Sequence, residues 1–209
     1  MLASSSTASR RTRAVESFKT ASDCIGPVHA GMSVFAVTRG QFSMIDAILH
    51  VLDQVGPAKI TLWTWTVAEY EVQSLDRLRL DGRVTAAELI IDTGAKVKNT
   101  KIIENWKASF GPGTVRYVVN HSKMATVESA TGLKVLLRGS CNLNNNPRFE
   151  QLDVTEGGPD FDLVKQIESE LPKIGESPKY AEIQAASRVG DAFTPEDLKA
   201  FGQFKVWAK

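Results

Sequence analysis

The stretch VNHSKMATVE at residues 119–128 and the stretch GSCN at residues 139–142 hold the densest group of reactive side chains in the chain. They combine a histidine, a lysine, a carboxylate, hydroxyls and amides in two short segments that are predicted to lie on neighbouring strands. Side chains two residues apart on a strand share a face. A regular strand from residue 114 onward would therefore place His121 and Lys123 together, and Ser140 and Asn142 would pair in the same way.

These side chains suit chemistry on a phosphate diester. A neutral imidazole such as that of His121 is a nucleophile that can attack phosphorus and form a covalent intermediate. The lysine, hydroxyl and amide near it would supply the preorganised donors that developing charge on phosphoryl oxygens requires. Glu150 or Glu128 could accept a hydrogen bond from the other ring nitrogen and fix the tautomer. The sequence shows no cluster of metal ligands, so we expect neither a metal ion nor another cofactor.

The same residues resemble the HKD motif of the phospholipase D superfamily, in which His-x-Lys-x₄-acid is followed by Gly-Ser-x-Asn. The motif stands here as His121-x-Lys123-x₄-Glu128 and Gly139-Ser140-Cys141-Asn142, with Glu150 downstream. The resemblance implies an α/β fold, with an αβα sandwich around a mixed, largely parallel central sheet. It also implies metal-independent phosphodiester chemistry through a phosphohistidine intermediate.

The family's site roles carry over onto the matching positions. The resemblance implies that His121 is the nucleophile and that Lys123 and Asn142 bind the phosphate. It also implies that Ser140 is a supporting donor and that Glu150 orients the nucleophile. Two positions depart from the family pattern, because Glu128 replaces the usual Asp and Asn144 stands where Ser or Thr is common. We expect these two residues only to support the site.

Family members use two such motifs, the second supplying a histidine that protonates the leaving oxygen. This chain has three histidines, and neither His29 nor His50 begins a second motif. The small bacterial endonucleases of the superfamily meet the same need with a twofold-symmetric homodimer. We therefore expect this protein to be a homodimer that brings two copies of His121 to one cleft.

Hydrophobic periodicity predicts strands and helices in alternation over the first half of the chain. The strands are expected at residues 33–37, 59–65 and 88–92, and the helices at residues 41–55, 67–80 and 98–110. Such alternation favours an α/β layer with parallel pairing. The second half is predicted to contain strands at 114–119, 123–128, 134–138 and 152–155, a hairpin turn at 129–132, and a helix at 160–171.

Three regions follow from this pattern. Residues 1–30 have no convincing period and are expected to form a basic, flexible tail that includes Arg10, Arg11 and Arg13. Residues 31–175 are expected to form the phospholipase D-like catalytic domain. Residues 176–209 are expected to be a helical extension, because Thr194 and Pro195 make a good helix start.

Composition sets few limits on the partners of the protein. The formal net charge of +1 gives no overall attraction to nucleic acid, so such binding would need a local patch. No apolar run approaches the length of a membrane span, and no secretory signal is visible. Two cysteines, both expected to be free, fit a reducing compartment, and we expect a cytoplasmic protein.

The leading hypothesis is a nuclease, with DNA a better candidate for the substrate than RNA. Two alternatives stay open: a phospholipid head-group hydrolase or transferase, and a non-catalytic nucleic-acid-binding protein that keeps the phosphate pocket. Trp63 and Trp65 would share a strand face and are expected in the core or a dimer interface, with base stacking as the alternative. Cys141 is expected to be a small buried residue rather than a nucleophile. Lys96, Lys98 and Lys101 are expected on a solvated face, with contact to a nucleic-acid backbone as the alternative.

Overall fold

The computed structural model describes residues 10–14, 18–95, 99–141, 143 and 148–171, and the fold is reported for these residues. The chain divides into two compact units, residues 1–177 and residues 178–209. The second unit lies outside the described residues, and so does the predicted C-terminal helical extension. The fold below is that of the first unit.

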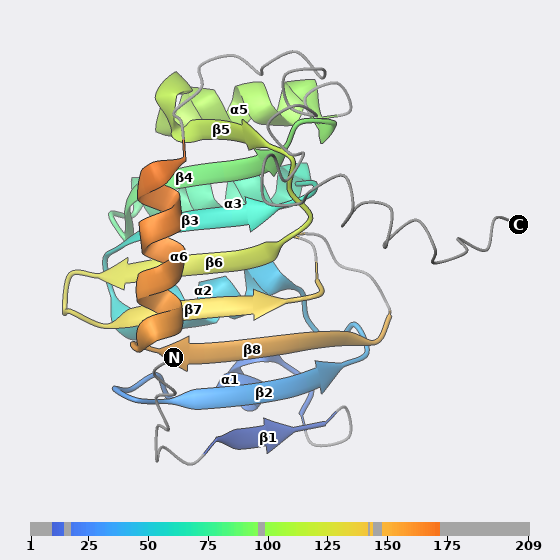
Figure 1. Cartoon of the computed structure of the whole chain (residues 1–209), viewed down its shortest axis with the longest axis vertical. Helices are drawn as coiled ribbons and strands as arrows, with labels where there is room; N and C mark the ends of the chain where they lie inside the picture. The colour runs from blue at the N-terminus through green and yellow to red at the C-terminus, as the bar shows by residue number, and fades with distance from the viewer. Residues whose placement is uncertain (1–9, 15–17, 96–98, 142, 144–147, 172–209) are drawn as a thin grey trace, which may run out of the picture. The chain divides into compact units, whose positions relative to one another are not determined.

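One mixed sheet runs through the described residues, with its strands side by side in the order β1-β2-β8-β7-β6-β3-β4-β5 (Figure 1). The strands are β1 (Arg11–Arg13), β2 (Ser33–Thr38), β3 (Ala58–Thr64), β4 (Val84–Asp92), β5 (Val115–Val118), β6 (Lys123–Ser129), β7 (Lys134–Gly139) and β8 (Glu150–Glu156). Parallel pairing joins β1 to β2, β3 to β4 and β4 to β5, whereas the other four adjacent pairs are antiparallel. The predicted mixed sheet is confirmed, but parallel pairs are the smaller share.

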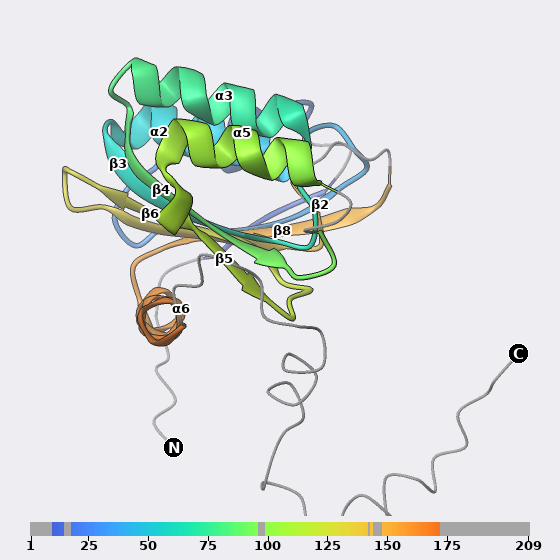
Figure 2. The ribbon, with the colours of Figure 1, turned by 90° about the horizontal axis from the view of Figure 1, so that it is seen from above.

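Helices cover both faces of the sheet, which confirms the predicted αβα sandwich. Figure 2 shows α2 (Met44–Val55), α3 (Glu69–Leu80) and α5 (Thr100–Phe110) on one face and α6 (Pro159–Glu170) on the other. The short helix α1 (Ala21–Ile25) packs against α2, and a 3₁₀ turn, η1 (Pro112–Thr114), precedes β5. Helix α2 begins at a capping box, because Ser43 and Asp46 each bind the other's backbone N–H.

The main core lies between the sheet and helices α1, α2, α3 and α5. Alternate apolar residues of the strands face these helices, and Leu62, Leu89, Ala125, Val127 and Leu137 are fully buried there. A smaller cluster under α6 consists of Leu136, Phe161 and Val164, with Met124 packed against it. The face that carries α6 is therefore less completely covered by apolar packing than the opposite face.

The N-terminal region differs from the predicted flexible tail. From residue 10 onward it contributes β1, which pairs in parallel with β2 through Arg11 opposite Val34, and the helix α1. Cys24 and Ile25 are fully buried, and Thr20 caps α1 by accepting from the backbone N–H of Asp23. A three-residue edge strand and a five-residue helix are too short to show a period, which is why the sequence pattern missed them.

Candidate active site at one edge of the sheet

Five strands meet at the edge of the sheet that holds four of the predicted site residues: His121, Lys123, Ser140 and Glu150. Strands β3 and β4 end there, β6 begins there at Lys123, β7 ends there at Gly139 and β8 begins there at Glu150. The ladder brings Lys123 opposite Gly139, and Thr38 at the end of β2 opposite Glu150. In open α/β sheets this edge, outside the carboxyl ends of the parallel strands, is where ligands bind. We call it the site edge.

A loop holds His121, and the strand does not continue regularly from residue 114 to Lys123. Strand β5 ends at Val118, and β4 and β3 separate it from β6. Residues 119–122 therefore cross the ends of two strands, and His121 and Lys123 do not share the face of one regular strand. A sequence period cannot reveal such a crossing, because β5 and β6 are consecutive in the chain but not neighbours in the sheet.

Asn120 fixes this loop to the sheet. Its side chain is buried, and its amide nitrogen donates to the carbonyl oxygen of Thr64 at 3.1 Å, while its Oδ1 accepts from the backbone N–H of Ser122 at 2.8 Å. The backbone N–H of Asn120 donates to Oδ2 of Asp92 at 3.0 Å. Sequence reasoning gave Asn120 no role, although an asparagine directly before the histidine is a residue type that often orders loops.

His121 and Lys123 lie together, as predicted. The side-chain nitrogen of Lys123 lies 3.0 Å from Nδ1 and 3.3 Å from Nε2 of His121, and it donates to the His121 carbonyl oxygen at 2.7 Å. His121 is exposed, whereas Lys123 is buried. The imidazole is thus open to an incoming molecule while the ammonium below it is held in place.

The electrostatics of Lys123 result from two opposing effects. Burial lowers the pKa of its ammonium from the ordinary value of 10.5, and the negative charge of Glu150 works in the opposite direction. The net direction is downward. An anion bound beside Lys123 would stabilise the charged form, so the site is suited to a phosphate group.

Ser140 and Glu150 form the other side of the site edge. The hydroxyl of Ser140 donates to the Glu150 carboxylate and accepts from the backbone N–H of Gln151 at 3.0 Å. Gly139 permits this arrangement, because a Cβ there would lie 2.3 Å from the carbonyl oxygen of Gln151. No hydrogen bond joins Glu150 to His121 among the described residues, so orientation of His121 by Glu150 stays a prediction.

One other predicted residue is not brought into this group. Glu128 is at the opposite end of β6 from Lys123, where it forms an ion pair of 2.7 Å with Lys165 of α6. It is therefore remote from His121. The predictions that Glu128 supports the site or fixes the tautomer of the His121 ring are wrong. Asn142 and Asn144 lie outside the described residues.

Trp63, on β3, and Trp65, just after the end of β3, have different environments. Trp63 is buried and donates to Oε1 of Glu168 at 3.0 Å, which confirms its place in the core. Trp65 is 42% exposed, and its ring centroid lies 6.0 Å from that of His121. Sequence reasoning had treated the two residues alike, because residues two apart on a strand share a face. The strand ends between them, at Thr64.

Cys141 is buried, as predicted, and burial raises the pKa of its thiol to about 12. The thiol therefore stays protonated near neutral pH and is a poor nucleophile. Both cysteines are free. No group of three or more His, Cys, Asp or Glu side chains that could hold a metal occurs in the described part of the chain. None of the described helices is long and apolar enough to span a membrane.

No family model matches the sequence, and no curated protein matches it. Among solved structures, polyphosphate kinase from Porphyromonas gingivalis matches with a TM-score of 0.51 at 13% identity, over 71% of this chain and 27% of that chain. It is a member of the phospholipase D superfamily. The chain has a phospholipase D-like fold. It spans 27% of the length of the kinase.

Two smaller structures also match. The phospholipase D family member Nuc from Salmonella typhimurium has a TM-score of 0.46 and 13% identity, over 66% of this chain and 91% of that one. NucT from Helicobacter pylori has a TM-score of 0.48 and 12% identity, over 66% of this chain and 95% of that one.

Proposed function

We propose that the protein is a metal-independent nuclease that cleaves phosphodiester bonds through a phosphohistidine intermediate and acts as a homodimer. The observation that supports this most is the pairing of an exposed His121 with a buried Lys123 at the site edge. Ser140, directly after β7, and Glu150, at the start of β8, are joined by a hydrogen bond on the other side of the site edge. On this fold the arrangement offers one nucleophile and several donors to a single phosphate.

In the proposed first step, a ring nitrogen of His121 attacks phosphorus, a P–N bond forms and the P–O bond to the leaving group breaks. Lys123 and Ser140 stabilise the negative charge that develops on the phosphoryl oxygens. The partner subunit's His121 donates a proton to the leaving oxygen. Water then attacks phosphorus, a P–O bond forms as the P–N bond to His121 breaks, and the proton of the water passes to that second histidine. Since the nucleophile belongs to the protein, no ribose 2′-hydroxyl is needed, and we propose DNA as the substrate.

Exposed apolar side chains near the site edge support the dimer. Trp65 follows β3, Val119 follows β5 and Phe149 precedes β8, with exposures of 42%, 55% and 67%. All three belong to segments that reach the same edge of the sheet. Large exposed apolar side chains gathered in one region often mark a surface that another protein covers. A second copy across this edge would cover them and place two His121 rings in one cleft.

The cleavage experiment uses single- and double-stranded DNA in excess chelator. Wild-type protein is expected to cleave, and His121→Ala is expected to lose at least about a thousandfold of the rate, since the nucleophile is removed. His29→Ala is the matched control, because His29 is also exposed and lies outside the site edge. Cleavage that disappears in chelator, or a His121→Ala protein as active as wild type, contradicts the proposal.

The covalent step and the dimer have their own tests. Acid-free quenching during turnover should trap an acid-labile phosphate on wild-type protein and none on His121→Ala. The mass in solution, measured by sedimentation at the assay concentration, should be that of two chains. A monomer with full activity would overturn the role given to the partner subunit's His121.

A further inference from the structure

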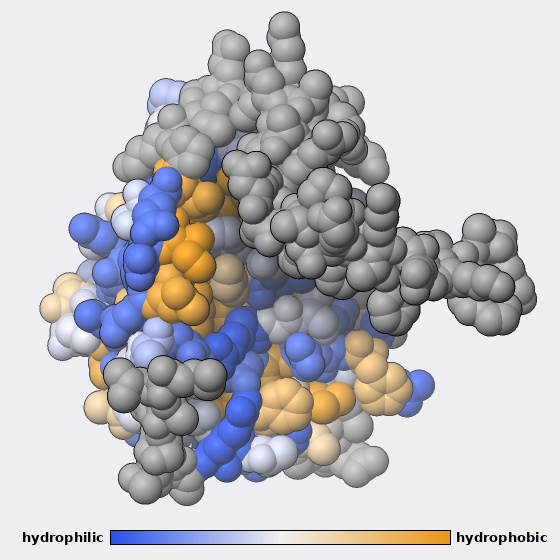
Figure 3. Space-filling model, viewed as in Figure 1, coloured by the Kyte–Doolittle hydropathy of each residue, from blue (hydrophilic) through white to orange (hydrophobic). Residues whose placement is uncertain are grey.

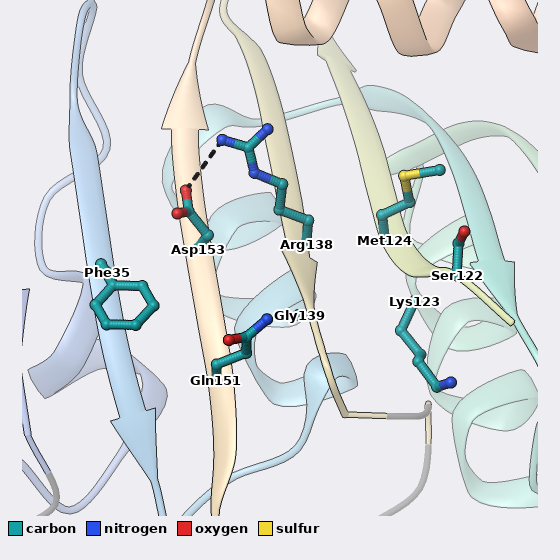
Figure 4. A pocket seen from close by; sticks show the side chains of 8 residues that line it. All are labelled: Phe35, Ser122, Lys123, Met124, Arg138, Gly139, Gln151 and Asp153. Carbon is teal, nitrogen blue, oxygen red and sulfur yellow. Dashed lines mark ion pairs between the residues drawn. The ribbon is translucent and has the colours of Figure 1, made fainter. Parts of the chain in front are cut away.

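A cavity of about 320 Å³ opens beside Lys123 on the face of the sheet that carries α6 (Figure 4). Its lining comes from four adjacent strands, β6, β7, β8 and β2, and the residues used below are Lys123, Met124, Arg138, Gln151, Asp153 and Phe35. We call this cavity the side groove. Apart from Lys123, these side chains have no part in the chemistry proposed above.

The ladder register arranges the side groove as a row across the strands. Met124 lies opposite Arg138, Arg138 opposite Asp153, and Asp153 opposite Phe35. Neighbouring strands are about 4.8 Å apart, so this row spans roughly 14 Å from β6 to β2. Gln151 lies on β8 between this row and the site edge. Lys123 is itself among the residues that line the groove, so a group bonded to a phosphate at the site edge can enter it.

The lining is mixed in chemical character. Phe35 and Met124 supply apolar surface at the two ends of the row, and the guanidinium, carboxylate and amide between them supply hydrogen-bond donors and acceptors. Figure 3, drawn from the same side as Figure 1, shows hydrophilic side chains between the apolar ones on this face. The groove therefore offers an aromatic face together with polar groups of both kinds.

The carboxylate of the groove is compensated by neighbouring cations. Asp153 forms an ion pair with Arg10 and lies 3.6 Å from Arg138, which also binds Asp160 at 2.5 Å. Arg10 in addition lies over the Phe35 ring, with its guanidinium carbon 5.2 Å from the ring centroid. A phosphate held at Lys123 would thus meet no uncompensated negative charge in the groove.

We propose that the side groove binds the nucleoside attached to the scissile phosphate. The proposal deepens the proposed function and rests on it for the position of the phosphate. A volume near 300 Å³ is at the lower end of small-ligand sites, which suits a group of this size. The base stacks on the Phe35 side of the groove. The amide of Gln151, an exposed side chain, meets its polar edge and is one of the groups that read bases elsewhere.

Other groups linked to phosphate fit the groove less well. An acyl chain would require a continuous apolar lining, whereas this one contains a guanidinium and a carboxylate. A chain of phosphates would require several cations that are not already paired, whereas Arg138 is bound by two carboxylates. A base that enters the groove must be unpaired. The inference therefore predicts a preference for single-stranded over double-stranded DNA.

The substrate for the test is a dinucleoside phosphate, which has one phosphodiester bond and one base on each side. Two analogues each lack one of the bases. Wild-type protein is expected to cleave one analogue as well as the parent and the other with kcat/KM lower by roughly five- to a hundredfold, the range given by base–aromatic stacking. The impaired analogue identifies the side whose base occupies the side groove.

The variants are Gln151→Ala and Phe35→Leu. Gln151 is exposed and contacts Ser140 only through its backbone, so its truncation preserves the site edge. Phe35→Leu keeps apolar volume and removes the aromatic face. Both variants should raise KM for the parent with kcat little changed, and should have no further effect on the impaired analogue. Gln54→Ala, an exposed glutamine on α2, is the matched control and should behave as wild type.

Two outcomes would overturn the inference. One is that loss of either base leaves wild-type cleavage unchanged; the other is that the groove variants weaken the parent and the impaired analogue equally. Failure of the proposed function is distinguishable, because wild-type protein would then cleave none of the three substrates. In that case, calorimetric binding of a single-stranded oligonucleotide decides the matter: weaker binding by both groove variants than by Gln54→Ala supports the groove, and equal binding refutes it.

Discussion

The side-chain nitrogen of Lys123 lies within 3.3 Å of both ring nitrogens of His121 and donates to the carbonyl oxygen of the same residue at 2.7 Å. The lysine is buried and the histidine is exposed. A bond to the backbone keeps the ammonium beside the imidazole whatever the ring orientation. The two side chains therefore have complementary positions. The exposed ring can contact the substrate, and the ammonium is held beside it where the phosphate would bind.

At alkaline pH, activity is predicted to fall at a pH below the ordinary lysine pKa of 10.5. Burial lowers the pKa of Lys123 from 10.5, so the ammonium that would hold the phosphate is lost as pH rises through that lowered value. The kcat/KM profile should fall there. Lys123→Arg keeps its charge to higher pH and should shift the limb upward, although its different shape should lower the rate by about ten- to a hundredfold. A limb at the same pH in both proteins would contradict this assignment.

The same lowered pKa has a consequence for folding. Between the folded pKa and 10.5 the unfolded chain binds more protons than the folded one, so the free energy of unfolding should rise with pH in that window. The penalty for a buried charge is fully present below the folded pKa. Lys123→Met cannot titrate and should lack this rise, while losing activity by about a hundredfold or more. Denaturant unfolding at several pH values, for the two proteins in parallel, measures the difference.

Asn120→Ala is predicted to impair both stability and catalysis. The substitution leaves the Thr64 carbonyl and the Ser122 N–H without the partner they have now. Lost buried hydrogen bonds of this kind cost about 1–3 kcal/mol in the free energy of unfolding. The loop that positions His121 should also loosen, so kcat should fall more than KM rises. Asn105→Ala on α5 is the control and should stay within about 0.5 kcal/mol. A stable Asn120→Ala protein with normal kcat would show that the loop is held otherwise.

Gly139→Ala is predicted to disturb the β7–β8 ladder. A Cβ at this position would lie 2.3 Å from the Gln151 carbonyl oxygen, which is backbone and cannot move alone. Overpacking of this kind costs about 1–3 kcal/mol and should also shift Ser140 relative to Glu150. Gly113→Ala is the matched control, because no atom lies within 4 Å of its added Cβ. Thermal unfolding of the two variants should separate them clearly, and equal stability would refute the steric explanation.

Glu168→Leu is predicted to be severely destabilising. The carboxylate is buried, accepts from Trp63 and Thr126 at 3.0 Å each, and pairs with Lys165 at 2.7 Å. Its removal leaves the buried Trp63 N–H and Thr126 hydroxyl without their acceptor, at about 1–3 kcal/mol for each. Glu170→Ala on the same helix is exposed and should change stability by less than about 0.5 kcal/mol. Comparable denaturation midpoints for the two variants would mean that α6 is not held by this carboxylate.

Much of the scaffold could be predicted because its signals are local. The helices at 44–55, 69–80, 100–110 and 159–170 and the hairpin between β6 and β7 follow the expected positions within a few residues. The strand of residues 84–92 was predicted too short, at 88–92, because its first half is partly exposed and lacks an apolar run. Partial exposure at a strand's end is set by what packs over it, and the sequence does not carry that information.

Periodicity and spacing along the chain are local signals, and they were enough to predict most helices and strands and the residues of the HKD-like motif. Which strands are neighbours depends on the tertiary structure. From that pairing follow the crossing loop at 119–122, the remote position of Glu128 and the row of side chains in the side groove. The N-terminal strand β1 also depends on the tertiary structure, because it forms by pairing with β2. Strand pairing depends on contacts between residues far apart in sequence, and a local pattern does not record them.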